Sequence, residues 1–150
     1  MNVRRRLQSD RGSQLVEFAL IFPLLLLVVM GVADFGVMFQ RYEVLTNAAR
    51  EGARVAALPD YASADVSARV DQYLAGTGVT GYTTSGPTTE SVNVGGSCIT
   101  LKGVTVTYDY QFIALGRLIQ IVTRGSTNPL TTKTLTVTSK MRFEGPAGTC

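Results

Sequence analysis

One carboxylate stands at the edge of the most apolar stretch of the chain. Glu17 is the only charged residue between Leu15 and Ala33. A charged group at the centre of a membrane helix costs about 2.5–3.5 kcal/mol on insertion scales, and less near the interface, so a cationic partner usually offsets it. The first chemistry that the sequence indicates is therefore an ion pair at the edge of a membrane.

The chain has few of the groups that catalysis uses. It contains no histidine, the commonest general base and metal ligand, and its two cysteines, Cys98 and Cys150, have no metal-ligand spacing. No Gly-x-Ser-x-Gly motif for a nucleophilic serine occurs, and the acidic residues after residue 58 are scattered. We therefore expect no enzyme activity, no cofactor, no metal and no small-molecule substrate.

The apolar stretch that follows the glutamate has the length of a membrane span. Residues 15–33 are nineteen residues long. As a helix rising roughly 1.5 Å per residue they would extend about 28 Å, close to the ~30 Å apolar thickness of a bilayer. We expect one transmembrane helix here.

The net charge of +3 comes entirely from the N-terminus. Residues 1–12 contain Asp10 and four arginines, and the remaining ten basic and ten acidic residues balance. A basic cluster just before an apolar stretch is typical of the cytoplasmic side of a membrane. We interpret the charge as a topology signal rather than a nucleic-acid site, with the N-terminus cytoplasmic and the bulk of the chain exported. Asp34, which closes the apolar stretch, is interpreted as an interface marker.

The helical pattern continues beyond the apolar stretch. Apolar residues recur at three- and four-residue steps as far as Ala56, which predicts one helix over about residues 13–58, ending before Pro59. Small residues at close spacing in its second half predict close packing, within the monomer or between subunits. They are Ala48, Ala49, Gly52, Ala53 and Ala56.

Residues 59–150 are predicted to form an exported α+β head. We expect a short helix over about residues 62–75 and a mobile, exposed loop over the Gly-, Ser-, Thr- and Pro-rich residues 76–90. Alternating apolar and polar residues then predict antiparallel strands. These are two long strands at 104–112 and 135–143 and two short ones at 91–94 and 98–101, with a turn at Gly95-Gly96; between the long strands, residues 112–130 fit either a helical turn or a third strand.

The two cysteines fall in the part that this topology exports, where thiols can oxidise. A disulfide between Cys98 and Cys150 would close a loop of about fifty residues and stabilise the fold by roughly 4 kcal/mol. The alternative is two unrelated thiols.

Several motifs in residues 11–58 form a specific combination. They are Arg11-Gly12, Val16-Glu17-Phe18-Ala19, Pro23, Gly31, Phe35-Gly36 and the Asn-Ala-Ala-Arg-Glu-Gly-Ala-Arg block at residues 47–54. In this combination the segment resembles the TadE-like family of minor pilins or pseudopilins of tight-adherence (Flp) type IV pilus systems. The resemblance covers about a third of the chain and implies a pilin-like fold, with a long N-terminal helix carrying a small head.

The resemblance also implies how the N-terminus is used. A prepilin peptidase would cut between Gly12 and Ser13 and leave residues 1–12 in the cytoplasm, so that Glu17 and Phe18 become the fifth and sixth mature residues. The new amine on Ser13, with a reference pKa of about 7.7–8.0, could pair with Glu17 of its own or a neighbouring helix. In such pilins this acid guides docking at the base of a filament. The implied partners are other pilin or pseudopilin subunits and an inner-membrane assembly platform.

Other interpretations of the N-terminus stay open. Residues 31–33 could be the cleavage site of a secretory signal peptide, or the apolar stretch could be a plain signal anchor, but neither makes use of Glu17. The acid could also lie at the interface without a role in assembly. The alternative function is a membrane-anchored or secreted binding module that uses the loop at 76–90. Our prediction is a non-catalytic, single-pass inner-membrane pilin subunit, placed in the fibre, at its tip or in the membrane as an assembly factor.

Overall fold

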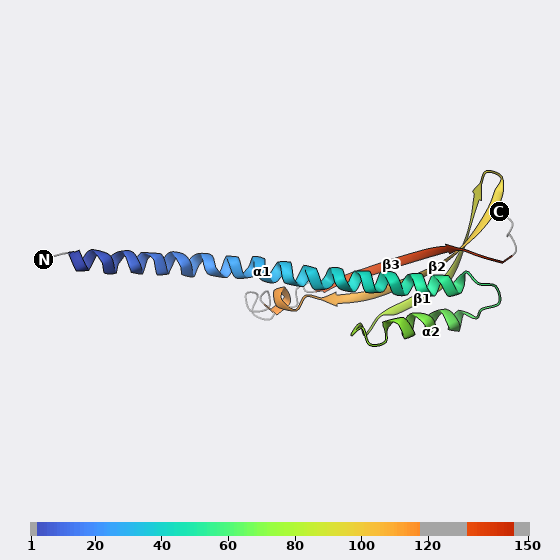
Figure 1. Cartoon of the computed structure of the whole chain (residues 1–150), viewed down its shortest axis with the longest axis horizontal. Helices are drawn as coiled ribbons and strands as arrows, with labels where there is room; N and C mark the ends of the chain where they lie inside the picture. Colours follow the sequence, from blue (N-terminus) through green and yellow to red (C-terminus); the bar gives the residue numbers. More distant parts are fainter. Residues whose placement is uncertain (1–2, 118–131, 146–150) are drawn as a thin grey trace. The chain divides into compact units, whose positions relative to one another are not determined.

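A computed structural model describes residues 3–117 and 132–145. Its elements, drawn in Figure 1, are α1 (Val3–Ala56), α2 (Ser63–Leu74), β1 (Thr83–Val94), β2 (Ser97–Gln111) and β3 (Thr132–Arg142). The predicted α+β class, with a long N-terminal apolar helix, a short helix and a small antiparallel sheet, is confirmed. The chain divides into two compact units, here named the anchor unit (residues 1–36 and 112–131) and the head unit (37–111 and 132–150).

Helix α1 contributes residues to both units and begins earlier than predicted. It starts at Val3 rather than near Ser13, and it ends at Ala56. Residues 3–11 contain no proline or glycine and several arginines, leucine and glutamine, which are good helix formers, so nothing local stops the helix there. At the other end the Leu58 N–H bonds the Val55 carbonyl (3.1 Å), which tightens the last turn just before Pro59.

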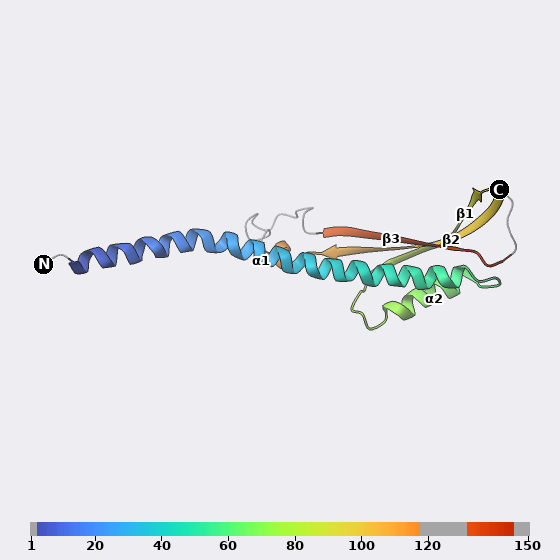
Figure 2. The same cartoon turned by 45° about the horizontal axis from the view of Figure 1, so that its top comes forward.

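In the head unit, α2 runs alongside the C-terminal part of α1 (Figure 2). Near its start, the Asp65 carboxylate accepts a hydrogen bond from the Ala62 N–H (2.9 Å), which satisfies a backbone donor next to the helix N-terminus. Val66, Val70 and Leu74 are buried on one face of α2, as the helical spacing predicts. This face forms part of the core of the head unit.

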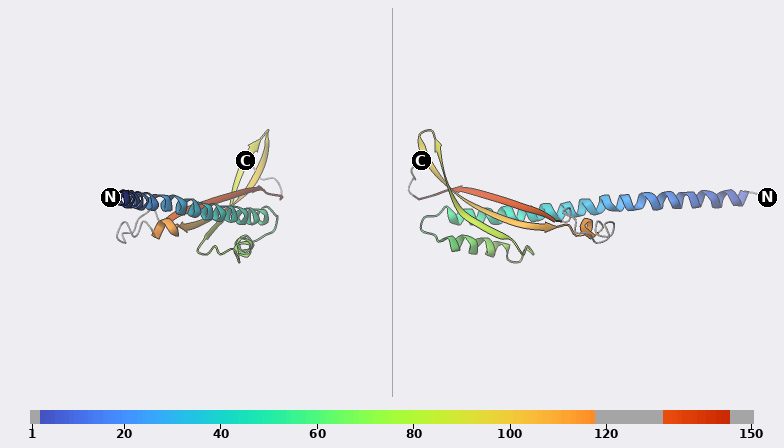
Figure 3. Two further views of the ribbon diagram at one scale, coloured as in Figure 1. Left: turned by 60° about the vertical axis from the view of Figure 1, so that its left-hand side comes forward. Right: turned by 180° about the vertical axis from the view of Figure 1, so that it is seen from behind.

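The sheet has the order β1-β2-β3, and both strand pairs are antiparallel. Figure 3 shows the strands crossing one side of α1 within the head unit. Alternate residues of β2 and β3 are buried toward the core: Val104, Val106, Tyr110, Leu135 and Val137. The other face is polar, with Thr105 bonded to Thr138 (2.8 Å) and Thr134 donating to Asp109 (2.6 Å). The predicted two-residue alternation is thus confirmed in both long strands.

The prediction of a mobile loop over residues 76–90 is wrong for its second half. Residues 83–90 belong to β1, which pairs with β2 on both sides of a register shift between Ser85 and Thr88. Threonine is β-branched and fits a strand, and a proline is tolerated at a bulge in an edge strand, where Pro87 lies. The glycine, serine and proline residues of this stretch favour a loop when the sequence is considered without its partner strand.

The short predicted strands are parts of longer ones. Residues 91–94 end β1 and residues 98–101 begin β2. Gly95 and Gly96 form the two-residue turn between them, with φ values of 59° and 83°. A tight hairpin turn with positive φ at both positions strongly favours glycine, so this prediction is confirmed.

The remaining part of the predicted loop is tied to both helices of the head unit. The Arg41 guanidinium of α1 donates to the Thr77 carbonyl, and the Tyr82 hydroxyl donates to Asp71 on α2 (2.7 Å). The Asp71 hydrogen bond, together with burial, raises the pKa of Tyr82 to about 12. Residues 76–82 are therefore held by named contacts.

For residues 112–130 the sequence was compatible with either a helical turn or a third strand. The structure describes this segment as far as Arg117. Residues 114–117 are helical. The rest of that segment, residues 118–130, lies outside the described residues.

Candidate assembly and anchoring site

The predicted processing site lies on the exposed surface of α1. Gly12 and Ser13 are both exposed. A Cβ atom added to Gly12 would meet nothing within 4 Å. Glu17 is also exposed, four residues after Ser13. Residues four apart on an α-helix share a face, so an amine on Ser13 would lie one turn from the Glu17 carboxylate.

The residue next to the glutamate begins an apolar surface that is largely exposed among the described residues. Phe18 is exposed, and its ring centroid lies 5.4 Å from that of Phe22, one turn further along. None of the most apolar window of this helix is buried, and by length and composition Gly12–Ala56 could cross a membrane. A contiguous exposed apolar surface of this kind marks a membrane or protein contact.

Asp34, at the end of this apolar surface, makes a contact that the sequence did not reveal. Its side chain is 4% exposed. Its carboxylate oxygens accept hydrogen bonds from the backbone N–H groups of Ile113 (3.3 Å), Ala114 (3.0 and 3.3 Å) and Leu115 (2.7 Å). The first N–H groups of a helix have no partner within the helix, and a carboxylate satisfies them well. Interpreting Asp34 as an interface marker was therefore incomplete.

Two further contacts hold the same segment against α1 within the anchor unit. The Leu115 methyl groups lie 3.9–4.0 Å from where a Gly31 Cβ would be, so a larger side chain at that position would press on them. The rings of Phe35 and Phe112 meet edge to face, with centroids 5.7 Å apart. The segment that begins at Phe112 is therefore fastened to the last turns of the apolar part of α1.

The predicted small residues of α1 are buried in the core of the head unit. Ala48, Ala49, Ala53 and Ala56 are fully buried, and Gly52 is buried beside them. A Cβ on Gly52 would lie 2.7 Å from Val70 of α2 and 3.2 Å from Val104 of β2. Both the second helix and the sheet thus reach the α1 backbone at this point.

An ion pair connects α1 to α2 beside this contact. Arg69 donates from Nε and Nη2 to one Glu51 oxygen, at 3.2 and 2.9 Å, and Arg54 donates to the same oxygen at 3.2 Å. The Arg69 hydrogen bond is the main cause that lowers the pKa of Glu51 from its ordinary value of 4.5. The Glu51 side chain is 29% exposed, so solvent screens the pair.

We expect Glu51→Gln to lower the free energy of unfolding by less than about 1 kcal/mol at neutral pH. Because the folded pKa of Glu51 is lowered, its contribution is present above pH 4.5 and is lost as the pH falls below that value. Chemical denaturation at neutral and acidic pH measures this. The difference in the free energy of unfolding between parent and Glu51→Gln should disappear at acidic pH. Glu43→Gln, at an exposed position of α1, should have the stability of the parent at every pH.

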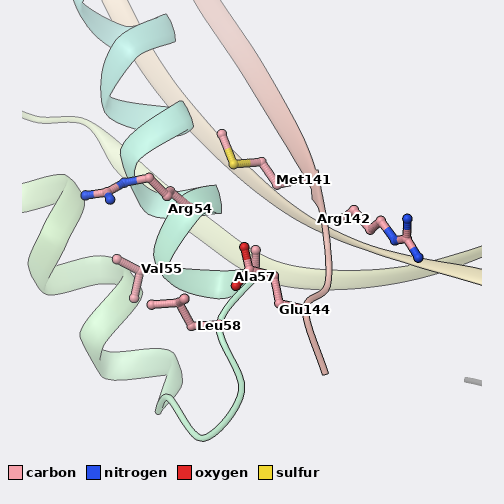
Figure 4. A pocket seen from close by; sticks show the side chains of 7 residues that line it. All are labelled: Arg54, Val55, Ala57, Leu58, Met141, Arg142 and Glu144. Carbon is pink, nitrogen blue, oxygen red and sulfur yellow. The ribbon is translucent and has the colours of Figure 1, made fainter. Parts of the chain in front are cut away.

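A groove of about 420 Å³ in the head unit lies at the end of α1 and the end of β3. It is lined by Arg54, Val55, Ala57, Leu58, Met141, Arg142 and Glu144. Figure 4 shows the guanidinium groups of Arg54 and Arg142 pointing in opposite directions. The charges do not converge, so the groove lacks the clustered polar groups of a ligand site.

Cys98 lies near the start of β2, is half-buried and is disulfide-bonded. Its predicted partner, Cys150, lies outside the described residues, and the pairing of the two stays a prediction.

Comparison with known proteins supports the N-terminal half of this description. Residues 12–54 match the family of TadE-like proteins, which confirms the resemblance over this segment. The match ends within α1 and so does not extend to α2 or the sheet. No curated protein and no solved structure matches the chain.

Proposed function

We propose that this chain is a minor pilin or pseudopilin that takes part in the assembly of a tight-adherence (Flp-type) pilus without catalysing a reaction. One observation carries the proposal: the TadE-like match coincides with an exposed apolar helix that bears Gly12, Ser13 and Glu17 at its N-terminal end. A structural subunit needs this arrangement because the same helix must first lie in lipid and then pack in an assembly.

The proposed mechanism begins with proteolysis. A prepilin peptidase removes residues 1–12 at the cytoplasmic face of the inner membrane, and the amine of Ser13 becomes cationic near neutral pH. Glu17 lies one helical turn away, so the pair offsets the cost of a carboxylate at the edge of the hydrocarbon. In an assembly the same carboxylate can pair with the amine of a neighbouring subunit. An ion pair that can be exchanged between copies sets the depth at which a subunit docks.

The remaining partners follow from this placement. The head unit lies on the far side of the inner membrane from the N-terminus, and the apolar part of α1 meets other pilin subunits and the membrane-embedded assembly platform. Since the small residues of α1 are buried within the head unit, contacts with other subunits fall to the exposed apolar part of the helix.

We expect the chain recovered from its own cells to begin at Ser13. Intact-mass or N-terminal analysis measures this directly. A chain that begins at Asp34 would indicate a secreted module, and one that retains Met1 would indicate an ordinary signal anchor.

A pair of glycine variants tests the assignment of the cleavage site. Gly12→Leu should block processing and leave residues 1–12 attached. Gly36→Leu makes the same change in the same helix, at a position where an added Cβ meets nothing within 4 Å, and should be processed normally. Normal processing of Gly12→Leu would contradict the assignment.

A further inference from the structure

The segment that Asp34 holds lies beside the C-terminal end of the apolar stretch. Leu115 packs on Gly31, and Gly31 belongs to the apolar stretch of residues 15–33. Asp34 and Phe35, which hold the rest of the segment, follow that stretch directly. If residues 15–33 span the bilayer, residues 112–117 lie within about one helical turn, or 5.4 Å, of the edge of the hydrocarbon.

From this position we propose that residues 112–117 insert into the boundary between headgroups and acyl chains of the leaflet at the Ala33 end of the span. They would form a second membrane contact, separate in sequence from the span. The inference rests on the membrane placement of α1 that is part of the proposed function.

The side chains around the segment suit this environment. Ile113 is 62% exposed, and so are Val32 (70%) and Phe35 (54%), which lie on either side of Asp34 in the sequence. Exposed apolar side chains therefore occur both at the end of the apolar stretch and on the segment that Asp34 holds, and the lipid that covers the stretch would also meet this segment. Arg117, the last residue of the helical turn at 114–117, is exposed. From there a guanidinium can reach lipid phosphates while its stem lies among apolar groups.

The backbone N–H groups of this segment also suit a poorly hydrated environment. A turn that enters an apolar phase must satisfy its own N–H groups, because each unpaired group there costs several kcal/mol. Here three successive N–H groups, from Ile113 to Leu115, bond the Asp34 carboxylate. The carboxylate is in turn covered, at 4% exposure. The N–H groups of residues 113–115 are therefore already bonded, and the turn can enter lipid without the cost of leaving them unpaired.

Tryptophan fluorescence tests the proposal, because the chain contains no tryptophan. Ile113→Trp in the full-length chain, reconstituted into phosphatidylcholine vesicles, gives one reporter at the exposed position. Lipids brominated near the glycerol backbone quench a tryptophan at that depth. Because both leaflets carry the bromine label, the orientation of the protein does not affect the result. Leu24→Trp reports on the span, and Val94→Trp reports on an exposed position of the head unit.

We expect Ile113→Trp to show blue-shifted emission and strong quenching by these lipids, and Val94→Trp to show neither. Quenching of Ile113→Trp no greater than that of Val94→Trp, with Leu24→Trp quenched by deeply brominated lipid, would overturn the inference and leave the membrane span intact. Blue-shifted emission without quenching would assign the surface to a protein neighbour and also overturn it. If Leu24→Trp is not quenched, residues 15–33 do not span the bilayer, and the inference is overturned as well.

Discussion

Cells that carry Glu17→Ala as their only copy of this protein are expected to insert and process the chain but to lose their pili. Removing one partner of a buried ion pair costs about 3–5 kcal/mol, because the other charge is left without compensation. At roughly 1.4 kcal/mol per factor of ten, subunit docking would weaken more than a hundredfold. Counting pili by electron microscopy measures the loss.

Four controls separate the loss of docking from failed insertion, failed processing and a general effect of removing an acid. N-terminal analysis of Glu17→Ala should still give Ser13, and membrane fractionation should still recover the chain. Glu17→Gln keeps the size of the side chain without its charge, so it should fail like Glu17→Ala if electrostatics is the cause. Glu43→Ala removes an exposed acid from α1 within the head unit and should leave piliation unchanged. Normal piliation in Glu17→Ala would refute the role of the carboxylate.

The second large effect is expected at Gly52, where α2 and β2 both reach the α1 backbone. A Cβ at this position would lie 2.7 Å from a Val70 methyl group and 3.2 Å from a Val104 methyl group. Valine has one strongly preferred rotamer in a helix, so Val70 yields little without movement of α2. Overpacking a core costs about 1–3 kcal/mol, and replacing glycine by alanine within a helix returns up to about 1 kcal/mol.

We therefore expect Gly52→Ala to lower the free energy of unfolding by up to about 2 kcal/mol, which is the overpacking cost of about 1–3 kcal/mol less a helix-propensity gain of about 1 kcal/mol. Gly52→Leu should prevent the head unit from packing at all. Thermal unfolding of the full-length chain in detergent, followed by near-ultraviolet circular dichroism, measures both. Gly36→Ala is the matched control, since an added Cβ there meets nothing within 4 Å, and it should not be destabilised. A Gly52→Ala variant as stable as Gly36→Ala would show that the contact relaxes without cost.

Much of the fold could be predicted because its signals are local. The helical period predicted α2 to within a residue or so at each end, and the two-residue alternation predicted the buried face of β2 and β3. The Gly95-Gly96 turn was predicted from the backbone angles that such a turn requires. Each of these depends on a few neighbouring residues and on one buried face.

The structural prediction was wrong where the local composition favoured one structure and pairing with another strand favoured a different one. Residues 83–90 have the composition of a loop, yet β2 supplies a hydrogen-bonding partner along that stretch. Backbone N–H and C=O groups that find partners in a neighbouring strand form a ladder even where the local preference is weak. No pattern within residues 83–90 could show that the partner was present.

By itself the sequence determined the membrane-length apolar stretch, the position of Glu17 at its edge and the motifs that match the TadE-like family, because charge, hydropathy and motif spacing are properties of consecutive residues. Tertiary structure alone decided that the small residues of α1 are buried by α2 and β2, and that Asp34 holds a turn about eighty residues away. The physical reason is that burial and capping depend on which distant segment supplies the covering atoms and the N–H donors. Those partners are set by the packing of the whole chain.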